Sequence, residues 1–468
     1  MDNTKKAWRP DFVYKAGSFE SNCALICDDD AQIVGISPAN QVENATLLKG
    51  RALLPGLINA HSHAFQRVIR GRTEFRTANN RDSFWTWREM MYSAAARLTP
   101  EDVYDASRMA FLEMALSGIT AVGEFHYLHH APDGNAYDDP NLLARQVVRA
   151  ANEVGLRIAL LRVAYARSGF ETESNHKQRR FIEADPAIYL KHLEQLGKDL
   201  GEMTGPGKTA WTGAAPHSVR AVPLDYLKEI IAVANSKQLR VHMHVAEQPA
   251  EVSACIKEYG RSPVALLATE GLLSEYFTGV HVIHVTPKAI RMLAEARAMV
   301  CACPTTERNL GDGIVPADRF FDQGVRISLG TDSHVEIDLL EDARELEYHL
   351  RLQKTERAIL ASAHDAGKSA LAVHLFDCAT INGAMSIDAP GGILETGHPA
   401  DFFTVDLNDP SIAGTSSDDL LSAIVFSLST TAIRDVVVGG KRIVEDGRHA
   451  QQEDIVERFK ALQKKLWG

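Results

Sequence analysis

The stretch LLPGLINAHSH, residues 53–63, joins an apolar run to two histidines at positions 61 and 63. The apolar run is typical of a buried β-strand, and a spacing of two residues on a strand points His61 and His63 to the same face. Two neutral imidazoles that converge on one point can bind a metal ion. The alternative is a pair of partly buried polar residues that hydrogen-bond to the backbone, so the rest of the chain has to decide.

Seven further segments of this kind follow, and longer stretches with apolar residues at spacings of three and four separate several of them. The predicted strands are residues 53–63, 119–127, 156–165, 211–219, 239–247, 279–287, 299–307 and 325–334. Amphipathic helices are predicted at residues 100–117, 142–155 and 224–237. Eight parallel strands that alternate with helices predict an α/β fold, a (β/α)8 barrel of the TIM type.

Both ends of the chain differ from this middle part. Residues 10–52 and 400–447 carry short β-type runs with Gly and Asp at the turns. Neither end makes a full sheet alone, so we expect both termini to combine into one small β-domain with a closing helix at DIVERFKALQKKL. The predicted domain boundaries are 1–54, 55–390 for the barrel, and 391–468 including the closing helix.

Composition excludes several classes of protein. The 468 residues include 50 Lys and Arg against 61 Asp and Glu, a formal net charge of −11, which gives no long-range attraction for nucleic acid or an anionic membrane. We find no signal-peptide pattern and no run near the roughly 18 apolar residues of a membrane helix, so we expect a cytoplasmic protein. The six cysteines lack the spacing of a structural zinc site and are expected to be reduced.

Polar residues gather at the carboxyl ends of the predicted strands, where a barrel of this type builds its active site. They are His61, His63, Glu124, His126, Tyr127, His217, His244, Glu247, His284 and Asp332. We predict a metal site of three imidazoles and one carboxylate, which suits a borderline metal such as Zn²⁺; its ligands are His61, His63, His244 and Asp332. The alternative for Asp332 is a helix N-cap, but its place beside three histidines favours a ligand. His242 lies one layer deeper and is expected to hydrogen-bond within the barrel.

Two sets of motifs resemble known enzymes. The segments PGLINAHSH, HMHVAE, VIHVT, LGTDSH and GHPADFFTVDL resemble the amidohydrolase superfamily over nearly the whole chain. The segments HSHAFQR, DSFWTWREMMY, EFHYLHH, HSVRAV and TTERNLGDGI are similar to the formiminoglutamate deiminases of histidine degradation. The resemblance implies a barrel with a β-sandwich formed by both termini, and a zinc-dependent hydrolase that converts N-formimino-L-glutamate to N-formyl-L-glutamate and ammonia.

The resemblance also implies one zinc ion per chain, bound by His61, His63, His244 and Asp332. The strand-four segment WTGAAPHSV lacks the lysine that binuclear relatives usually carry, which argues for a single metal. Zinc lowers the pKa of bound water to about 7 and so supplies hydroxide at neutral pH. The reaction also needs side chains that carry protons to and from the reacting atoms.

Three residues are predicted to handle the protons. Glu247 can take a proton from the water and pass it to the departing nitrogen, although by position alone it is equally a glutamate of a helix first turn. His284, on the next strand, and Asp332 complete the predicted catalytic set. His281 is an odd number of residues from His284 and is expected to face the opposite side of the strand as a structural residue.

The two carboxylates of the implied substrate require cationic side chains. Arg88 and Arg220 lie in the motifs FWTWRE and HSVRAV and are predicted to clamp the carboxylates, although each by itself would be an ordinary surface arginine. Gln66, Tyr127 and His217 are predicted to add hydrogen bonds to the substrate.

Some questions stay open at the level of sequence. An aminohydrolase acting on a ring such as guanine or a triazine would use the same zinc set, but it should not need two arginines. A non-catalytic scaffold would not keep the complete ligand set together with Glu247. The polar segment TTERNLGDGI is expected to border the pocket, the Arg- and Asn-rich stretch 76–81 departs locally from the resemblance, and a homodimer is an open alternative to a monomer.

Overall fold

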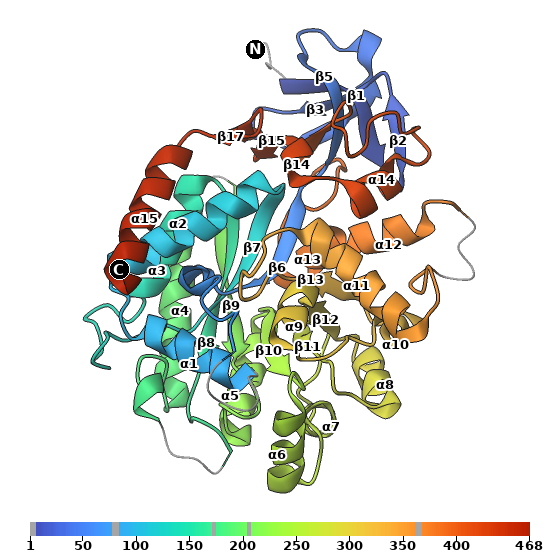
Figure 1. The fold of residues 1–468 in the computed structure, drawn as a ribbon. Coiled ribbons are helices and arrows are strands. Elements are labelled where there is room, and N and C mark those ends of the chain that lie inside the picture. Colours follow the sequence, from blue (N-terminus) through green and yellow to red (C-terminus); the bar gives the residue numbers. More distant parts are fainter. Residues whose placement is uncertain (1–5, 77–83, 171–174, 204–206, 362–366) are drawn as a thin grey trace.

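The computed structural model describes residues 6–76, 84–170, 175–203, 207–361 and 367–468, and its centre is a parallel barrel (Figure 1). Within these residues, eight parallel strands follow one another in chain order, from β6 to β13. They are β6 (Leu57–Ser62), β7 (Ile119–His126), β8 (Arg157–Ala164), β9 (Ala210–Pro216), β10 (Val241–Val245), β11 (Phe277–His281), β12 (Met299–Ala302) and β13 (Ile327–Leu329). The predicted (β/α)8 fold is confirmed.

The barrel closes where its first and last strands meet. Ser62 and Asp332 form an isolated parallel bridge. The backbone N–H of Asp332 donates to the carbonyl of His61 at 3.0 Å, and the N–H of His63 donates to the carbonyl of Asp332 at 3.1 Å. A Cβ at Gly330 would lie 2.7 Å from the His61 Cβ and 2.9 Å from its carbonyl oxygen, so this approach requires glycine.

Helices surround the barrel, and the three that the sequence predicts are confirmed as α2 (Pro100–Leu116), α3 (Leu142–Val154) and α5 (Leu224–Ser236). Helix α2 begins at a capping box in which Thr99 and Asp102 exchange hydrogen bonds. The other helices around the barrel are α1 (Phe84–Ala95), α4 (Pro186–Met203), α6 (Pro249–Tyr259), α7 (Pro263–Thr269), α8 (Pro287–Glu295), α9 (Pro304–Leu310), α10 (Ala317–Asp322) and α11 (Leu339–Lys354). Short 3₁₀ helices lie at Ala39–Gln41, Ala64–Ile69, His176–Gln178 and Thr430–Ala432.

The barrel strands all end earlier than the sequence predicts, and the difference is five or six residues for β11, β12 and β13. Strand β11 ends at His281 because His281 and Val282 take left-handed backbone conformations, with φ of 69° and 53°. Strand β12 ends at Ala302, and Pro304 then begins α9, where a proline loses no hydrogen bond. Beyond these strand ends, side chains no longer alternate between two faces, so residue spacing does not tell which way they point.

The two termini meet in a second sheet, at one end of the molecule (Figure 1). Its main path has the order β17-β16-β15-β14-β5-β1-β3-β4, and β2 pairs with β1. The strands are β1 (Lys6–Lys15), β2 (Ser18–Ser21), β3 (Cys23–Cys27), β4 (Ile33–Pro38), β5 (Thr46–Pro55), β14 (Phe402–Asp406), β15 (Ile433–Val438), β16 (Lys441–Glu445) and β17 (Arg448–His449). Antiparallel pairing of β5 with β14 joins the two ends of the chain.

This terminal sheet has a small hydrophobic core of its own, in which Trp8 packs edge-on against Phe402 with ring centroids 5.0 Å apart. Strand β5 ends at Pro55 and barrel strand β6 starts at Leu57, so the chain passes directly from one sheet into the other. The domain boundaries after residues 54 and 390 stay predictions.

Helices α12 (Ala370–Ala379), α13 (Ile381–Ile387), α14 (Leu420–Ser427) and α15 (Gln452–Trp467) complete the fold. The segment Ala370–Ile387 has the length and composition of a membrane span, with a mean hydropathy of 1.3, contrary to our expectation that no run does. The segment is divided at Thr380 into α12 and α13, and 56% of it is buried inside the molecule against β6 and β13. These are core helices. The closing helix α15 is held on α2 by an ion pair between Lys465 and Asp102 at 2.6 Å.

The tight closure of the barrel generates a prediction for Gly330. The variant Gly330→Ala should lower the free energy of unfolding by about 1–3 kcal/mol, because the added methyl group overpacks the backbone of His61. Thermal unfolding of this variant and of Gly201→Ala gives the comparison. Gly201 lies within α4 and a Cβ there would meet nothing within 4 Å, so alanine at this position should leave stability unchanged or slightly higher. Equal melting temperatures for the two variants would contradict the closure argument.

Candidate metal centre and active site

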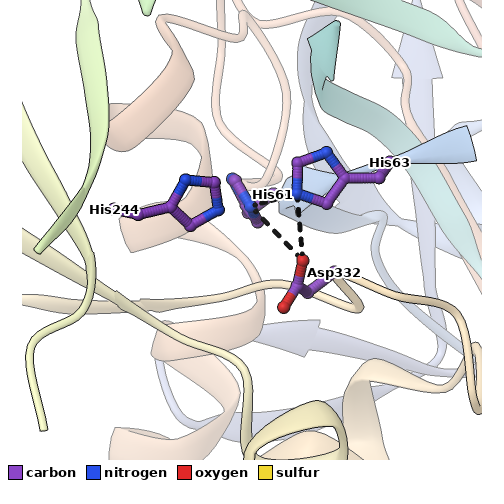
Figure 2. A group of neighbouring side chains, drawn as sticks. All are labelled: His61, His63, His244 and Asp332. Carbon is purple, nitrogen blue, oxygen red and sulfur yellow. Dashed lines mark hydrogen bonds and ion pairs between the residues drawn. The ribbon is translucent and has the colours of Figure 1, made fainter. Parts of the chain in front are cut away.

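Four side chains from different parts of the barrel point toward one another (Figure 2). The ligand atoms of His61, His63, His244 and Asp332 all lie within 4.8 Å of one another. Asp332 Oδ1 is 3.5 Å from His61 Nε2 and 3.2 Å from His63 Nε2. All four residues are buried, and the sequence-predicted set is thus one compact group.

The orientation of two imidazoles fits a metal ion. His63 Nδ1 donates to the carbonyl of Phe125 at 3.0 Å, and His244 Nδ1 donates to the carbonyl of His217 at 3.2 Å. Each bond places the proton on Nδ1, so the Nε2 lone pair is free toward the centre of the group. This is the tautomer that a metal ligand needs.

The protonation states fit a metal ion as well. Burial lowers the pKa of His61 to about 3 and lowers that of His244 well below its ordinary value. Burial would raise the pKa of Asp332, but the adjacent imidazoles of His61 and His63 outweigh this effect, and the net pKa lies well below the ordinary value. At neutral pH His61 and His244 are therefore neutral and the aspartate is ionised, as metal binding requires.

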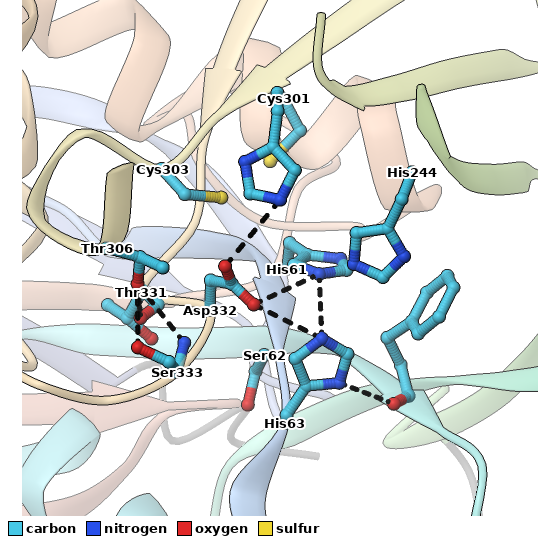
Figure 3. A network of polar contacts seen from close by, with 12 residues as sticks. His61, Ser62, His63, His244, Cys301, Cys303, Thr306, Thr331, Asp332 and Ser333 are labelled. Atoms are coloured by element: carbon cyan, nitrogen blue, oxygen red, sulfur yellow. Dashed lines mark hydrogen bonds and ion pairs between the residues drawn. The ribbon is translucent and has the colours of Figure 1, made fainter. Parts of the chain in front are cut away.

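A chain of hydrogen bonds behind the ligands ties the two closing strands together. Asn59 Nδ2 donates to Thr331 Oγ1 at 2.7 Å, and Thr331 N–H donates to Asn59 Oδ1 at 3.1 Å. His334 bridges Thr331 Oγ1 at 3.1 Å and Ser62 Oγ at 3.0 Å. Ser62 in turn donates to Glu124 at 2.5 Å, and burial raises the pKa of that carboxyl to about 7. Ser62, Thr331 and their neighbours are visible beside the ligands in Figure 3.

The ligand group opens into one cavity. Its lining includes His63, Gln66, Arg88, Tyr127, His217, Arg220, His244, Glu247 and Asp332, all of which the sequence predicts as site residues. Phe84, Trp87, Met91 and Leu310 supply apolar walls. The structure therefore brings together the predicted metal, proton-transfer and substrate residues, with the exception of His284.

Two arginines of this cavity are buried and have no carboxylate partner among the residues that the structure describes. Arg88 is 9% exposed and donates to the hydroxyl of Tyr165 at 2.8 Å. Arg220 is 8% exposed, and its Nε and Nη1 atoms have no hydrogen-bond partner. Within the described residues, neither guanidinium has a carboxylate oxygen within 4 Å. Two unpaired buried cations in one cavity indicate an anionic ligand.

Two further polar residues lie near the metal group, Gln66 in the 3₁₀ helix after β6 and His217 directly after β9. Gln66 donates from Nε2 to the hydroxyl of Tyr127 at 2.7 Å, and its Oε1 is buried without a hydrogen-bond partner. His217 contacts His244 with ring centroids 4.9 Å apart. Gln66 thus presents a free acceptor to a ligand that carries N–H groups.

His281 occupies the position that the sequence gives to His284. His281 Nε2 lies 3.7 Å from Asp332 Oδ2 and 3.8 Å from Glu247 Oε1, and the ring lines the cavity. His284 Nε2 instead donates to the backbone carbonyl of Asp312 at 2.9 Å, and His284 does not line the cavity. The expectation that His281 faces away is wrong, because the left-handed turn at His281 ends the strand before His284.

The pKa of Glu247 is raised above its ordinary value. Burial is the main cause and the charge of Asp332 adds to it, while His281, Arg220 and Arg88 act in the opposite direction. A carboxyl that binds a proton more readily than usual is suited to proton transfer in a cavity.

The segment TTERNLGDGI borders the cavity as expected, since it contains most of α9 and Leu310 lines the wall. Sequence reasoning missed Glu307 in this segment, which accepts a hydrogen bond from His281 Nδ1 at 3.1 Å. Periodicity could not find this contact, because it joins the last residue of β11 to the first turn of α9, a helix that the sequence reads as the end of a strand. Of the stretch 76–81, residues 77–81 lie outside the described residues.

Comparison with known proteins identifies the family of this chain. The model of the amidohydrolase family matches residues 52–443, and the chain belongs to that family. Formimidoylglutamate deiminase of Pseudomonas aeruginosa is 39% identical to it over 92% of this chain and 92% of that protein. A 5-methylthioadenosine/S-adenosylhomocysteine deaminase of Natronomonas pharaonis is 29% identical, over 90% of this chain and 88% of that protein. The crystal structure of an amidohydrolase from Brucella melitensis, 32% identical, superposes with a TM-score of 0.90 and covers 99% of this chain and 100% of that chain.

The geometry predicts which histidine the metal needs. His63→Ala should lose bound divalent metal on dialysis, because removing one of the four ligands and leaving a cavity in its place weakens the affinity of the site. His284→Ala is the matched control and should keep its metal, since His284 bonds to a loop carbonyl outside the cavity. Elemental analysis of both dialysed proteins checks this. Loss of metal from the His284 variant alone would reverse the assignment.

Proposed function

We propose that this chain is a metal-dependent hydrolase of C–N bonds that acts as a formimidoylglutamate deiminase. The reaction converts N-formimino-L-glutamate and water to N-formyl-L-glutamate and ammonia. The observation that carries the proposal is the pair of buried, unpaired arginines, Arg88 and Arg220, in the cavity of the metal group. A substrate with two carboxylates supplies both missing partners, and the 39% identical relative bears the name of this activity.

We propose one zinc ion per chain, held by His61, His63, His244 and Asp332. Zinc bound there supplies Lewis-acid activation of water at neutral pH. A second group in the described residues, His281, Cys303 and Glu307, also has its ligand atoms within 4.8 Å. We assign no metal to it, because Glu307 already accepts a hydrogen bond from His281 and burial raises the pKa of the Cys303 thiol well above its ordinary value.

The substrate would lie with its glutamate part toward the arginines and its formimino carbon toward the metal group. Arg88 and Arg220 would each bind a carboxylate, which offsets the cost of burying two guanidinium groups. The free Oε1 of Gln66 would accept a hydrogen bond from a formimino N–H, and Tyr127 and His217 would add contacts near the reacting carbon.

Glu247 is the proposed proton carrier. It would accept a proton from the attacking water and deliver it to the terminal nitrogen, which leaves as ammonia. His281, in place of His284, would face the reacting atoms from the other side, since its Nε2 points between Glu247 and Asp332. Asp332 would accept a hydrogen bond or a proton from the attacking water in addition to binding the metal.

The proposed location is the cytoplasm, and a homodimer stays a proposal for the assembly. All six cysteines are free thiols in the structure, and five of them are buried. Free thiols are typical of a reducing compartment.

A ring deaminase is the second candidate, because one relative that is 29% identical is named a 5-methylthioadenosine/S-adenosylhomocysteine deaminase. Ammonia release measured in parallel with N-formimino-L-glutamate, guanine, cytosine and S-adenosylhomocysteine separates the two. The proposal requires the highest kcat/KM with N-formimino-L-glutamate. Turnover of a ring compound in its place would establish the second candidate.

The arginines give a kinetic prediction. Arg88→Met and Arg220→Met should each lower kcat/KM for N-formimino-L-glutamate by roughly 30- to 150-fold, since each loses a charge-assisted hydrogen-bonded pair of about 2–3 kcal/mol. Arg97→Met makes the same change outside this cavity, where Arg97 donates to the carbonyl of Leu466, and should behave like the wild type. Near-normal kinetics in both cavity variants would exclude the carboxylate clamp.

The position of Glu247 predicts which bond breaks. If the arginines hold the glutamate end, Glu247 protonates the terminal nitrogen, and proton NMR should show N-formyl-L-glutamate formed in step with ammonia. Glu247→Gln should lose nearly all turnover while it retains bound metal. Formation of glutamate and formamide would mean that the substrate binds in the opposite direction, and full activity of Glu247→Gln would remove this residue from proton transfer.

A further inference from the structure

The imidazole of His281 is held from behind by one carboxylate. Glu307, on α9, is 1% exposed, and its Oε1 accepts from His281 Nδ1 at 3.1 Å and from the backbone N–H of Cys303 at 2.9 Å. We propose that Glu307 is a positioning residue for the reaction: it fixes the ring of His281 so that Nε2 faces the reacting atoms. This inference rests on the proposed function, in which His281 takes part.

The ring of His281 also stacks on His244, with centroids 5.5 Å apart, but stacking does not select which ring atom faces the cavity. His281 is the last residue of β11 and has a left-handed conformation with φ of 69°, so its side chain departs from the alternating directions of the strand. In the part of the chain that the structure describes, Nε2 has no hydrogen-bond partner, and the nearest carboxylate oxygens are those of Asp332 at 3.7 Å and Glu247 at 3.8 Å. Without the bond to Nδ1, the imidazole could turn and present a carbon atom to the cavity.

The carboxylate of Glu307 is itself rigidly placed by the first turn of α9. Thr305 donates from its backbone N–H at 3.0 Å and from its hydroxyl at 2.9 Å to Asp342 Oδ1 on α11. Thr306 shares a hydrogen bond of 3.1 Å with Ser333, the residue after Asp332, as Figure 3 shows. Glu307 therefore sits on a turn that is tied both to the surrounding helices and to the loop of the metal group.

The kinetic arm of the test uses two substitutions of Glu307. Glu307→Ala should lower kcat by about 10- to 100-fold and change KM less than two-fold, because the residue does not line the substrate cavity. Glu307→Gln keeps an oxygen that can accept both hydrogen bonds, and it should restore most of kcat. In a His281→Asn background, Glu307→Ala should cause no further loss, as expected of two residues that act through one group.

A matched control separates positioning from general loosening of α9. Asp342→Ala removes the two hydrogen bonds to Thr305 without touching His281, so it should lower the melting temperature but leave kcat within about two-fold. If Asp342→Ala lowers kcat as much as Glu307→Ala does, the proposal is wrong and Glu307 stabilises the helix only. Additive losses in the His281→Asn background would also overturn it.

A second measurement does not depend on the substrate. Proton NMR of protein labelled with ¹⁵N-histidine should show a downfield, hydrogen-bonded ring N–H that is present in the wild type and in Glu307→Gln, and absent from His281→Asn and Glu307→Ala. If the wild type fails to hydrolyse N-formimino-L-glutamate, the proposed function is wrong, yet this signal still decides whether Glu307 holds His281. A signal that persists in Glu307→Ala, or a second bound metal that is lost with Glu307, would overturn the positioning role.

Discussion

The site depends on the contact between the first and last strands of the barrel. Two backbone hydrogen bonds join Asp332 to His61 and His63. They place the aspartate next to both histidines independently of any side-chain interaction. A cyclic sheet has no free edges, so this closure is also what completes the fold. The metal group is therefore a product of barrel closure, and its stability is linked to the glycine at position 330 and to the buried hydrogen bonds of Asn59 and Thr331.

Burial then gives these groups their chemistry. The ligands are buried, which keeps His61 and His244 neutral, and Asp332 is held ionised by its two neighbours. In the same cavity, Arg88 and Arg220 keep their charges without a carboxylate partner among the described residues. Such an arrangement is costly in the free protein, and a dianionic ligand removes the cost on binding. The same physical argument thus underlies both the proposed metal site and the proposed choice of substrate.

Much of this was accessible from the sequence because it follows regular periods. Alternation of strands and helices predicts the barrel, and the rule that active sites lie at the carboxyl ends of barrel strands selects the ligand group and Glu247. What the sequence could not give depends on contacts outside regular strands. The predicted face of His281 is wrong because His281 itself has a left-handed backbone conformation and ends β11. The alternation of side chains with a period of two does not continue past such a residue. Glu307 is not accessible to a count by periods either, since its contact with His281 joins helix α9 to the end of β11. The sequence predicts that both termini combine in one small β-domain. It does not predict that β5 pairs with β14, or in which register.

The most direct test of the account is a crystal structure of the Glu247→Gln variant with zinc and the proposed product, N-formyl-L-glutamate. The account predicts one zinc ion among His61, His63, His244 and Asp332, with the formyl group beside it and the two carboxylates on Arg88 and Arg220. A ligand bound with a carboxylate on the metal, or bound without contact to either arginine, would contradict it.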